Sequence, residues 1–162
     1  MTGLKTNVNT VWYRNIKGNG RIKANQLQTQ IAIPESFGGS GEGANPMEIL
    51  VSAAAACYTS TLTITLDTQQ LPIAGLTMDT EAIQSEEGVR IVHFPHIVLA
   101  PDATEEQVQS AREAVVTAEQ NCFIGNMLIK GGVQIEVKGE ASLSSEADVI
   151  RQYMKEHALD SF

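Results

Sequence analysis

The alternation of apolar and polar positions predicts β-strands in the first fifth of the chain. Apolar residues recur at short spacing from residue 7 to residue 33, with the turn-forming run Lys17-Gly18-Asn19-Gly20 between them. This pattern is typical of antiparallel strands joined by tight turns. We expect strands at 11–13, 21–24 and 27–33, followed by a glycine-rich loop at 34–44.

A helix is expected directly after that loop. Asn45 suits the N-cap, Pro46 the first helical position, and Glu48 the third, from which its carboxylate can reach back to the cap. The following residues are apolar or small nearly all round, which predicts a buried helix. Residues 61–66 alternate like a strand, but no turn separates them from the helix, so we expect it to continue to about Gln69.

The second half of the chain predicts a mixture of strands and helices, and therefore an α+β fold. Thr104 and Gln107 form the signature of a helix cap, and Pro95 indicates a strand edge or a bulge. The expected elements are strands at 76–84 and 89–99, a helix from 104 to 118, a short helix at 121–129, a strand at 132–141 and an amphipathic helix at 145–159.

Composition and charge restrict the class of protein. The chain has 162 residues and is 43% hydrophobic, which is enough for one compact domain with a core of its own. Its 19 acidic and 11 basic residues give a formal charge of -8, which argues against nucleic acid or an anionic membrane as a partner. The N-terminus has no apolar signal region, and no apolar run approaches about 18 residues. We expect a soluble, cytoplasmic protein.

Cys57 and Cys122 are the only cysteines, and neither lies in a cluster with zinc-ligand spacing, so we expect no metal. Each is either a packing residue or a member of a redox pair. A cysteine nucleophile must be a thiolate, and an ordinary thiol has a pKa near 8.5. Cys57 lies three turns beyond Asn45, too far for the dipole of its own helix, so a guanidinium from elsewhere would be needed.

Two other chemistries are weaker alternatives. His93 and His96 allow a Cys-His nucleophilic enzyme, but on a strand they point to opposite faces, and satisfied strand histidines are the simpler interpretation. His157 is expected at the solvated edge of the last helix. The glycine-rich loop lacks a phosphate-binding motif and contains Glu42, so we interpret it as a loop that bends closely past a partner surface.

The run from Gly38 to Leu50, GGSGEGANPMEIL, and the run from Ala53 to Tyr58, AAAACY, resemble the signature of the OsmC/Ohr family. These are the osmotically inducible protein C and the organic hydroperoxide resistance proteins. The resemblance implies an α+β fold with a central cysteine helix, two subunits that wrap around each other, and no cofactor. It spans about residues 7–141, which suggests one domain at 1–143 and a separate tail helix at 144–162.

The resemblance also implies a thiol peroxidase that reduces organic hydroperoxides. Cys57 would attack the peroxide and become a sulfenic acid, Cys122 would condense with it to a disulfide, and a dithiol would restore both. The alternative is a non-catalytic module of the same fold that binds a small apolar ligand.

The family pairs an arginine with a glutamate beside the reactive thiol. Where the family usually has the glutamate, this chain has Met47, with Glu48 one place later, and the loop at 34–44 contains no Arg or Lys. We therefore expect Arg14 to serve as the catalytic arginine, with Arg21 as the alternative, and Glu48 to orient it. The residues expected to contact substrate are Arg21, Met47 and Tyr58.

Overall fold

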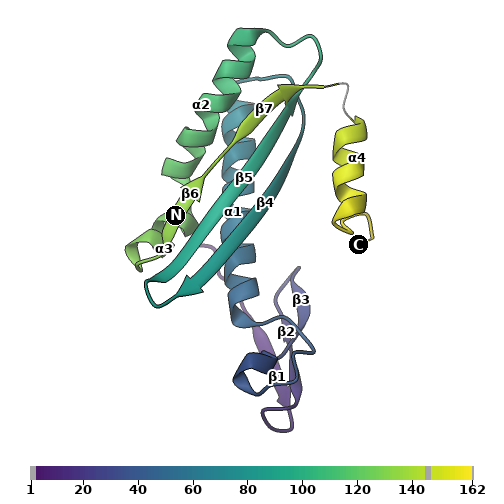
Figure 1. Ribbon diagram of the computed structural model, residues 1–162, viewed down its shortest axis with the longest axis vertical. Coiled ribbons are helices and arrows are strands. Elements are labelled where there is room, and N and C mark those ends of the chain that lie inside the picture. Colours follow the sequence, from purple (N-terminus) through teal and green to yellow (C-terminus); the bar gives the residue numbers. More distant parts are fainter. Residues whose placement is uncertain (1–2, 145–146, 162) are drawn as a thin grey trace. The chain divides into compact units, whose positions relative to one another are not determined.

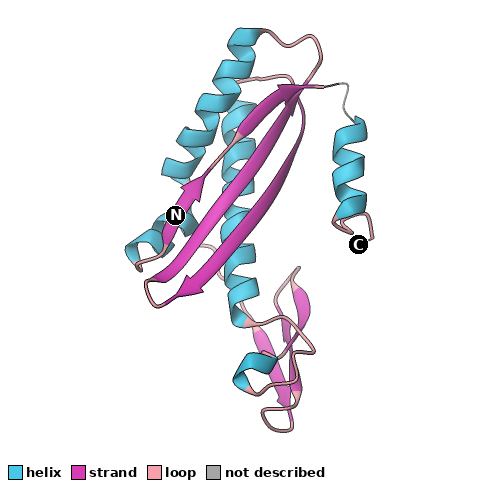
Figure 2. Ribbon diagram, viewed as in Figure 1, coloured by secondary structure: helices cyan, strands magenta, loops and turns pink. Residues whose placement is uncertain are grey.

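The computed structural model describes residues 3–144 and 147–161, and the chain divides into two compact units at the Ser52–Ala53 boundary. Within the described residues the protein has four α-helices and two separate sheets, which confirms the α+β class. Figure 2 distinguishes the helices from the strands.

The first unit is a three-stranded antiparallel sheet followed by a closed loop. Its strands are β1 (Asn9–Tyr13), β2 (Asn19–Lys23) and β3 (Gln28–Ile31), in the order β1-β2-β3, as the sequence predicts. The loop contains a 3₁₀ turn, η1 (Glu35–Phe37), and closes where Ala32 N–H donates to the Ala44 carbonyl at 3.1 Å.

The glycines of this loop serve its own folding. A Cβ at Gly39 would lie 1.9 Å from the Ile33 carbonyl oxygen, a distance that no side-chain carbon tolerates. Gly41, at φ 69°, donates its N–H to the same carbonyl at 3.0 Å. The close approach that the glycines permit is thus to the loop's own backbone, whereas the sequence suggested a partner surface.

Helix α1 (Pro46–Thr68) begins and ends close to the predicted positions. Glu48 N–H donates to Asn45 Oδ1 at 3.0 Å, and Asn45 N–H donates to Glu48 Oε2 at 2.7 Å. This reciprocal pair is the predicted capping box, and it uses one oxygen of the Glu48 carboxylate, Oε2.

The prediction that α1 is buried all round is wrong for the single chain. Its buried residues repeat every four positions and form one stripe, while Ile64 is 66% exposed. The helix also has the length and mean hydropathy that a bilayer-crossing helix would need, contrary to the sequence-based expectation that no segment does. The stripe packs against the sheet and α2 of the second unit, as a core helix does. Its residues are Ala54, Tyr58, Leu62 and Leu66.

The sheet of the second unit is built around one long interior strand. β5 (Gly88–Leu99) pairs antiparallel with β4 (Ile73–Ser85) and parallel with both β6 (Gln134–Val137) and β7 (Glu140–Leu143). The prediction that Pro95 marks a strand edge or a bulge is therefore wrong, since β5 is interior and Pro95 pairs with Met78 in regular register. Its lack of an N–H is tolerated because it lies between the β5 residues that pair with β6, which end at His93, and those that pair with β7, which begin at His96.

The predicted single strand at 132–141 is in fact two strands, separated by Lys138 and Gly139. Lys138 N–H donates to the His93 carbonyl at 2.9 Å. A Cβ at Gly139 would lie 2.8 Å from Val115 Cγ2, so the break allows a helix to pack closely on the sheet.

Helices α2 (Glu105–Asn121) and α3 (Phe123–Lys130) connect β5 to the parallel β6. The predicted capping box of Thr104 and Gln107 is confirmed. In Figure 1, α1 and α2 lie on the same side of the sheet, behind it in this view. The face of α2 that the sequence predicted to be apolar is buried there, and its residues are Val108, Ala111, Ala114, Val115 and Ala118.

The last helix, α4 (Ala147–Glu156), contacts β4. The first predicted residues of this helix, 145 and 146, lie outside the described residues. Tyr153 Oη donates to the Met78 carbonyl at 2.9 Å and to Asp79 Oδ1 at 2.7 Å. His157 is half-exposed, with Nε2 at 3.9 Å from Asp79 Oδ1.

Candidate functional site

Two cysteines from distant parts of the sequence lie together in the second unit. Cys57 is half-buried on α1, against the core cluster that contains Cys122. Cys122 is 4% exposed and separates α2 from α3 with an extended backbone, φ -70° and ψ 109°. The two thiols are neighbours, close enough for the Cys57 thiol to influence the pKa of Cys122. Both are free thiols, and a spacing of 65 residues in sequence gave no indication of this contact.

The N-terminus of α3 is directed at both sulfurs. Ile124 N–H donates to Cys57 Sγ at 3.4 Å, and the backbone N–H groups of Gly125 and Ile124 partly offset the raised pKa of Cys122. A Cβ at Gly125 would lie 3.2 Å from Cys122 Sγ, so the absence of a side chain at Gly125 avoids a steric conflict with this sulfur. Backbone N–H groups at a helix N-terminus stabilise negative charge, which a thiolate carries.

The role of α3 is not predicted from the sequence. The dipole of α1 begins too far from Cys57, but the helix that faces Cys57 is α3, which begins directly after Cys122. The signal was present in the short run Cys122-Phe123-Ile124-Gly125, where a small residue follows a cysteine at a helix start.

The environments of the two thiols differ. Burial, with a smaller effect from the Cys57 thiol, raises the pKa of Cys122 to about 11. Cys122 is therefore neutral at pH 7. Cys57 is the more exposed of the two sulfurs and accepts the Ile124 N–H. This asymmetry makes Cys57 the sulfur that a dissolved reagent reaches first.

Tyr58, the neighbour of Cys57, is buried, and a substrate would not reach it without displacing α2. Its hydroxyl donates to the Val115 carbonyl of α2 at 3.0 Å, and its ring stacks on His93 with centroids 5.2 Å apart. Burial, with smaller effects from Glu119 and Cys122, raises the pKa of the Tyr58 hydroxyl, so Tyr58 remains protonated.

The two strand histidines are satisfied within the sheet, as the simpler interpretation predicted. His93 Nδ1 lies 2.9 Å from Thr80 Oγ1, and His96 Nε2 lies 2.7 Å from Ser142 Oγ. Neither forms a hydrogen bond with a cysteine among the residues that the structure describes.

Because burial lowers the pKa of His93, acid is expected to destabilise the fold through this residue. In the unfolded chain His93 takes up a proton near pH 6.5, whereas in the folded chain burial disfavours the protonated form. The contribution of neutral His93 to the free energy of unfolding is therefore fully present above pH 6.5 and is lost as the pH falls through the lowered pKa of the folded state. Urea titrations from pH 7.5 to pH 5 are expected to show this decline in the parent and a weaker one in His93→Phe. His96→Gln serves as the control, and an equal slope in the parent and His93→Phe would contradict the assignment.

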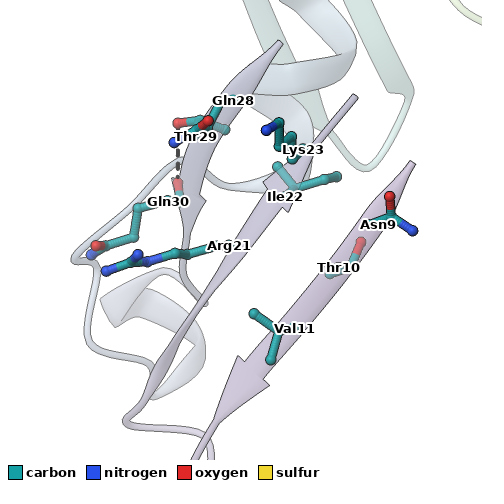
Figure 3. Close-up of a pocket in the computed structure, with 9 residues that line it drawn as sticks. All are labelled: Asn9, Thr10, Val11, Arg21, Ile22, Lys23, Gln28, Thr29 and Gln30. Atoms are coloured by element: carbon teal, nitrogen blue, oxygen red, sulfur yellow. Dashed lines mark hydrogen bonds between the residues drawn. The ribbon is translucent and has the colours of Figure 1, made fainter. Parts of the chain in front are cut away.

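The other predicted site residues belong to the first unit. Arg14 lies in the β1–β2 turn at φ 68°, and Met47 and Glu48 are in the first turn of α1. Arg21, on β2, lines a pocket of about 560 Å³ on the three-stranded sheet. Figure 3 shows its side chain extending toward Gln30, with Lys23 also in the lining. The predicted site residues are thus divided between the two units, and both cysteines belong to the second.

No group of three or more His, Cys, Asp and Glu side chains that could hold a metal ion occurs among residues 3–144 and 147–161.

Comparisons with known proteins give consistent matches. The sequence model of the OsmC-like proteins matches residues 39–138. The uncharacterized protein YmaD of Bacillus subtilis (strain 168) is 35% identical over 140 residues, which are 83% of this chain and 93% of the relative.

Two solved structures share the fold. An OsmC-like protein from Mycoplasma pneumoniae has a TM-score of 0.66 and 20% identity, covering 87% of this chain and 99% of that one. An organic hydroperoxide resistance protein OsmC from Legionella pneumophila has a TM-score of 0.61 and 20% identity, covering 83% of this chain and 96% of that one.

Proposed function

This chain belongs to the OsmC-like protein family, and from that premise we propose that it is a thiol peroxidase that reduces organic hydroperoxides. The observation that carries the proposal is that a partly exposed thiol, Cys57, lies beside a buried one, Cys122. Further support comes from the relatives of the same fold whose names include organic hydroperoxide resistance.

The first step is attack of the Cys57 thiolate on the O–O bond of the hydroperoxide. The sulfur gains one oxygen and becomes a sulfenic acid, and the alkoxide leaves and takes a proton to become the alcohol. The Ile124 N–H and the N-terminus of α3 stabilise the thiolate before attack. An arginine, Arg14 or Arg21, is proposed to join them, and Glu48 to orient it.

The second step is condensation of Cys122 with the sulfenic acid. The Cys122 sulfur displaces hydroxide, which leaves as water with the thiol proton, and a Cys57–Cys122 disulfide forms. An external dithiol then reduces this disulfide by exchange. The sum is one hydroperoxide and one dithiol converted into one alcohol, one water and one oxidised dithiol.

We propose that a second copy of the chain covers the apolar side chains that the single chain leaves exposed. Ile64 on α1 is 66% exposed, and Phe123 and Met127 on α3 are 70% and 52% exposed. Phe123 and Met127 belong to the helix whose N-terminus faces Cys57, where they provide an apolar surface for an alkyl group, and the exposure of all three side chains favours a homodimer.

Turnover of cumene hydroperoxide with dithiothreitol as the reductant tests the function. We expect hydroperoxide loss to match dithiol oxidation one to one and to exceed the rate with hydrogen peroxide, which has no apolar group to bind. Cumene hydroperoxide that binds but is not consumed would instead favour the non-catalytic ligand-binding module.

A further inference from the structure

The turn of α1 that carries Cys57 is fixed by the residue next to it. Consecutive residues of a helix point about 100° apart, so Cys57 and Tyr58 face different surroundings. Cys57 remains partly accessible, while Tyr58 is 1% exposed and enters the core. Any movement of the Tyr58 backbone therefore moves Cys57.

The Tyr58 hydroxyl ties α1 to α2. Its hydrogen bond to the Val115 carbonyl is the one side-chain hydrogen bond that joins these two helices among the described residues. Val115 lies seven residues, or about two helical turns, before Cys122, which ends α2. The bond thus links the helix of one thiol to the helix that ends at the other.

The Tyr58 ring is also held from the sheet. It stacks on the His93 imidazole with an interplanar angle of 10°, and Thr80 Oγ1 holds the imidazole at 2.9 Å. The stacking fixes the distance of the Tyr58 ring from the sheet, and the hydrogen bond fixes the direction of its hydroxyl. A residue that only filled space in the core would need neither restraint.

Disulfide formation is sensitive to such positioning. A disulfide requires a sulfur–sulfur bond of about 2.05 Å and Cα atoms about 4.4–6.8 Å apart, so a small shift of α1 along α2 changes how readily the two thiols join. We propose that Tyr58 is the positioning residue that holds Cys57 in register with Cys122. The proposal rests on the function proposed above, because it concerns the same pair of thiols.

The test is the equilibrium between the dithiol form and the Cys57–Cys122 disulfide in dithiothreitol redox buffers. Tyr58→Phe removes only the hydroxyl and retains the stacked ring. We expect its disulfide to be about fivefold less favoured than that of the parent, because the dithiol form can relax without the bond whereas the disulfide requires the register that the bond holds, and one buried hydrogen bond contributes about that factor. In stopped-flow oxidation, disulfide formation should slow to a similar degree, while the initial oxidation of Cys57, measured in the Cys122→Ser background, should stay the same.

Tyr153→Phe is the matched control. Tyr153 also donates its hydroxyl to a backbone carbonyl, that of Met78, but does so on α4. We expect this variant to leave the disulfide equilibrium unchanged, whatever it does to the stability of the reduced protein. An unchanged equilibrium in Tyr58→Phe, or an equal shift in Tyr153→Phe, would overturn the proposal.

If Tyr58→Phe does not fold, Thr80→Val tests the same positioning role of Tyr58. Thr80→Val releases the imidazole beneath the ring and is expected to shift the equilibrium about twofold in the same direction, and no shift would count against Tyr58. The equilibrium is measured without peroxide. If the parent turns over no peroxide but Tyr58→Phe still shifts the disulfide equilibrium, the proposed peroxidase function is refuted and the role of Tyr58 is not.

Discussion

Cys57→Ser is expected to lower cumene hydroperoxide consumption at least about 1000-fold, to the rate of the solution without enzyme, because a hydroxyl cannot replace a thiolate as nucleophile. Cys122→Ser is expected to behave differently. Its Cys57 should still consume one equivalent of peroxide, and the sulfenic acid should then persist because no resolving thiol is present.

Stopped-flow measurement of peroxide loss, with dimedone trapping of the sulfenic acid, distinguishes the two variants. Ser60→Ala provides a control on the same helix, since the Ser60 hydroxyl only bonds back to the Ala56 carbonyl. Peroxide consumption that survives in Cys57→Ser would mean that the chemistry belongs to another residue.

The buried thiol of Cys122 is expected to react very slowly at neutral pH. With a pKa of about 11, Cys122 in the Cys57→Ser variant should react with iodoacetamide at pH 7 at least about 100-fold more slowly than a free cysteine, and its rate should rise nearly tenfold per pH unit toward pH 10. Loss of Cys57 removes only a smaller cause of the shift, and the burial remains.

The rate in 6 M guanidinium chloride, where Cys122 is exposed, is the internal reference for this measurement. It should match that of a free cysteine. Rapid alkylation of the folded variant at pH 7 would show that Cys122 is not shielded, and would remove the distinction between an attacking and a resolving thiol.

Local sequence signals predicted the elements but not their contacts. The capping residues at Asn45 and Thr104 correctly located the starts of α1 and α2, because caps are made by residues close together in the chain. The strand at 132–141 was predicted unbroken, because its interruption at Gly139 depends on the distant Val115.

In the candidate site, too, the sequence identifies residues but not their contacts. Cys57 and Cys122 could be identified as residues, yet their contact and the N–H of Ile124 between them depend on how α1 packs against α2 and α3. Tyr58 was expected to contact substrate because it adjoins Cys57 in sequence. The helical turn between the two residues instead directs it into the core.

Whether Cys57 and Cys122 form one redox pair can be decided by a single titration. Reduced protein is mixed with one equivalent of cumene hydroperoxide, the remaining thiols are blocked, and tryptic peptides are mapped by mass spectrometry without reduction. We expect loss of both thiols and a peptide pair joined through Cys57 and Cys122. Two free thiols after the peroxide is consumed, or disulfides that join only Cys57 to Cys57 of separate chains, would contradict it.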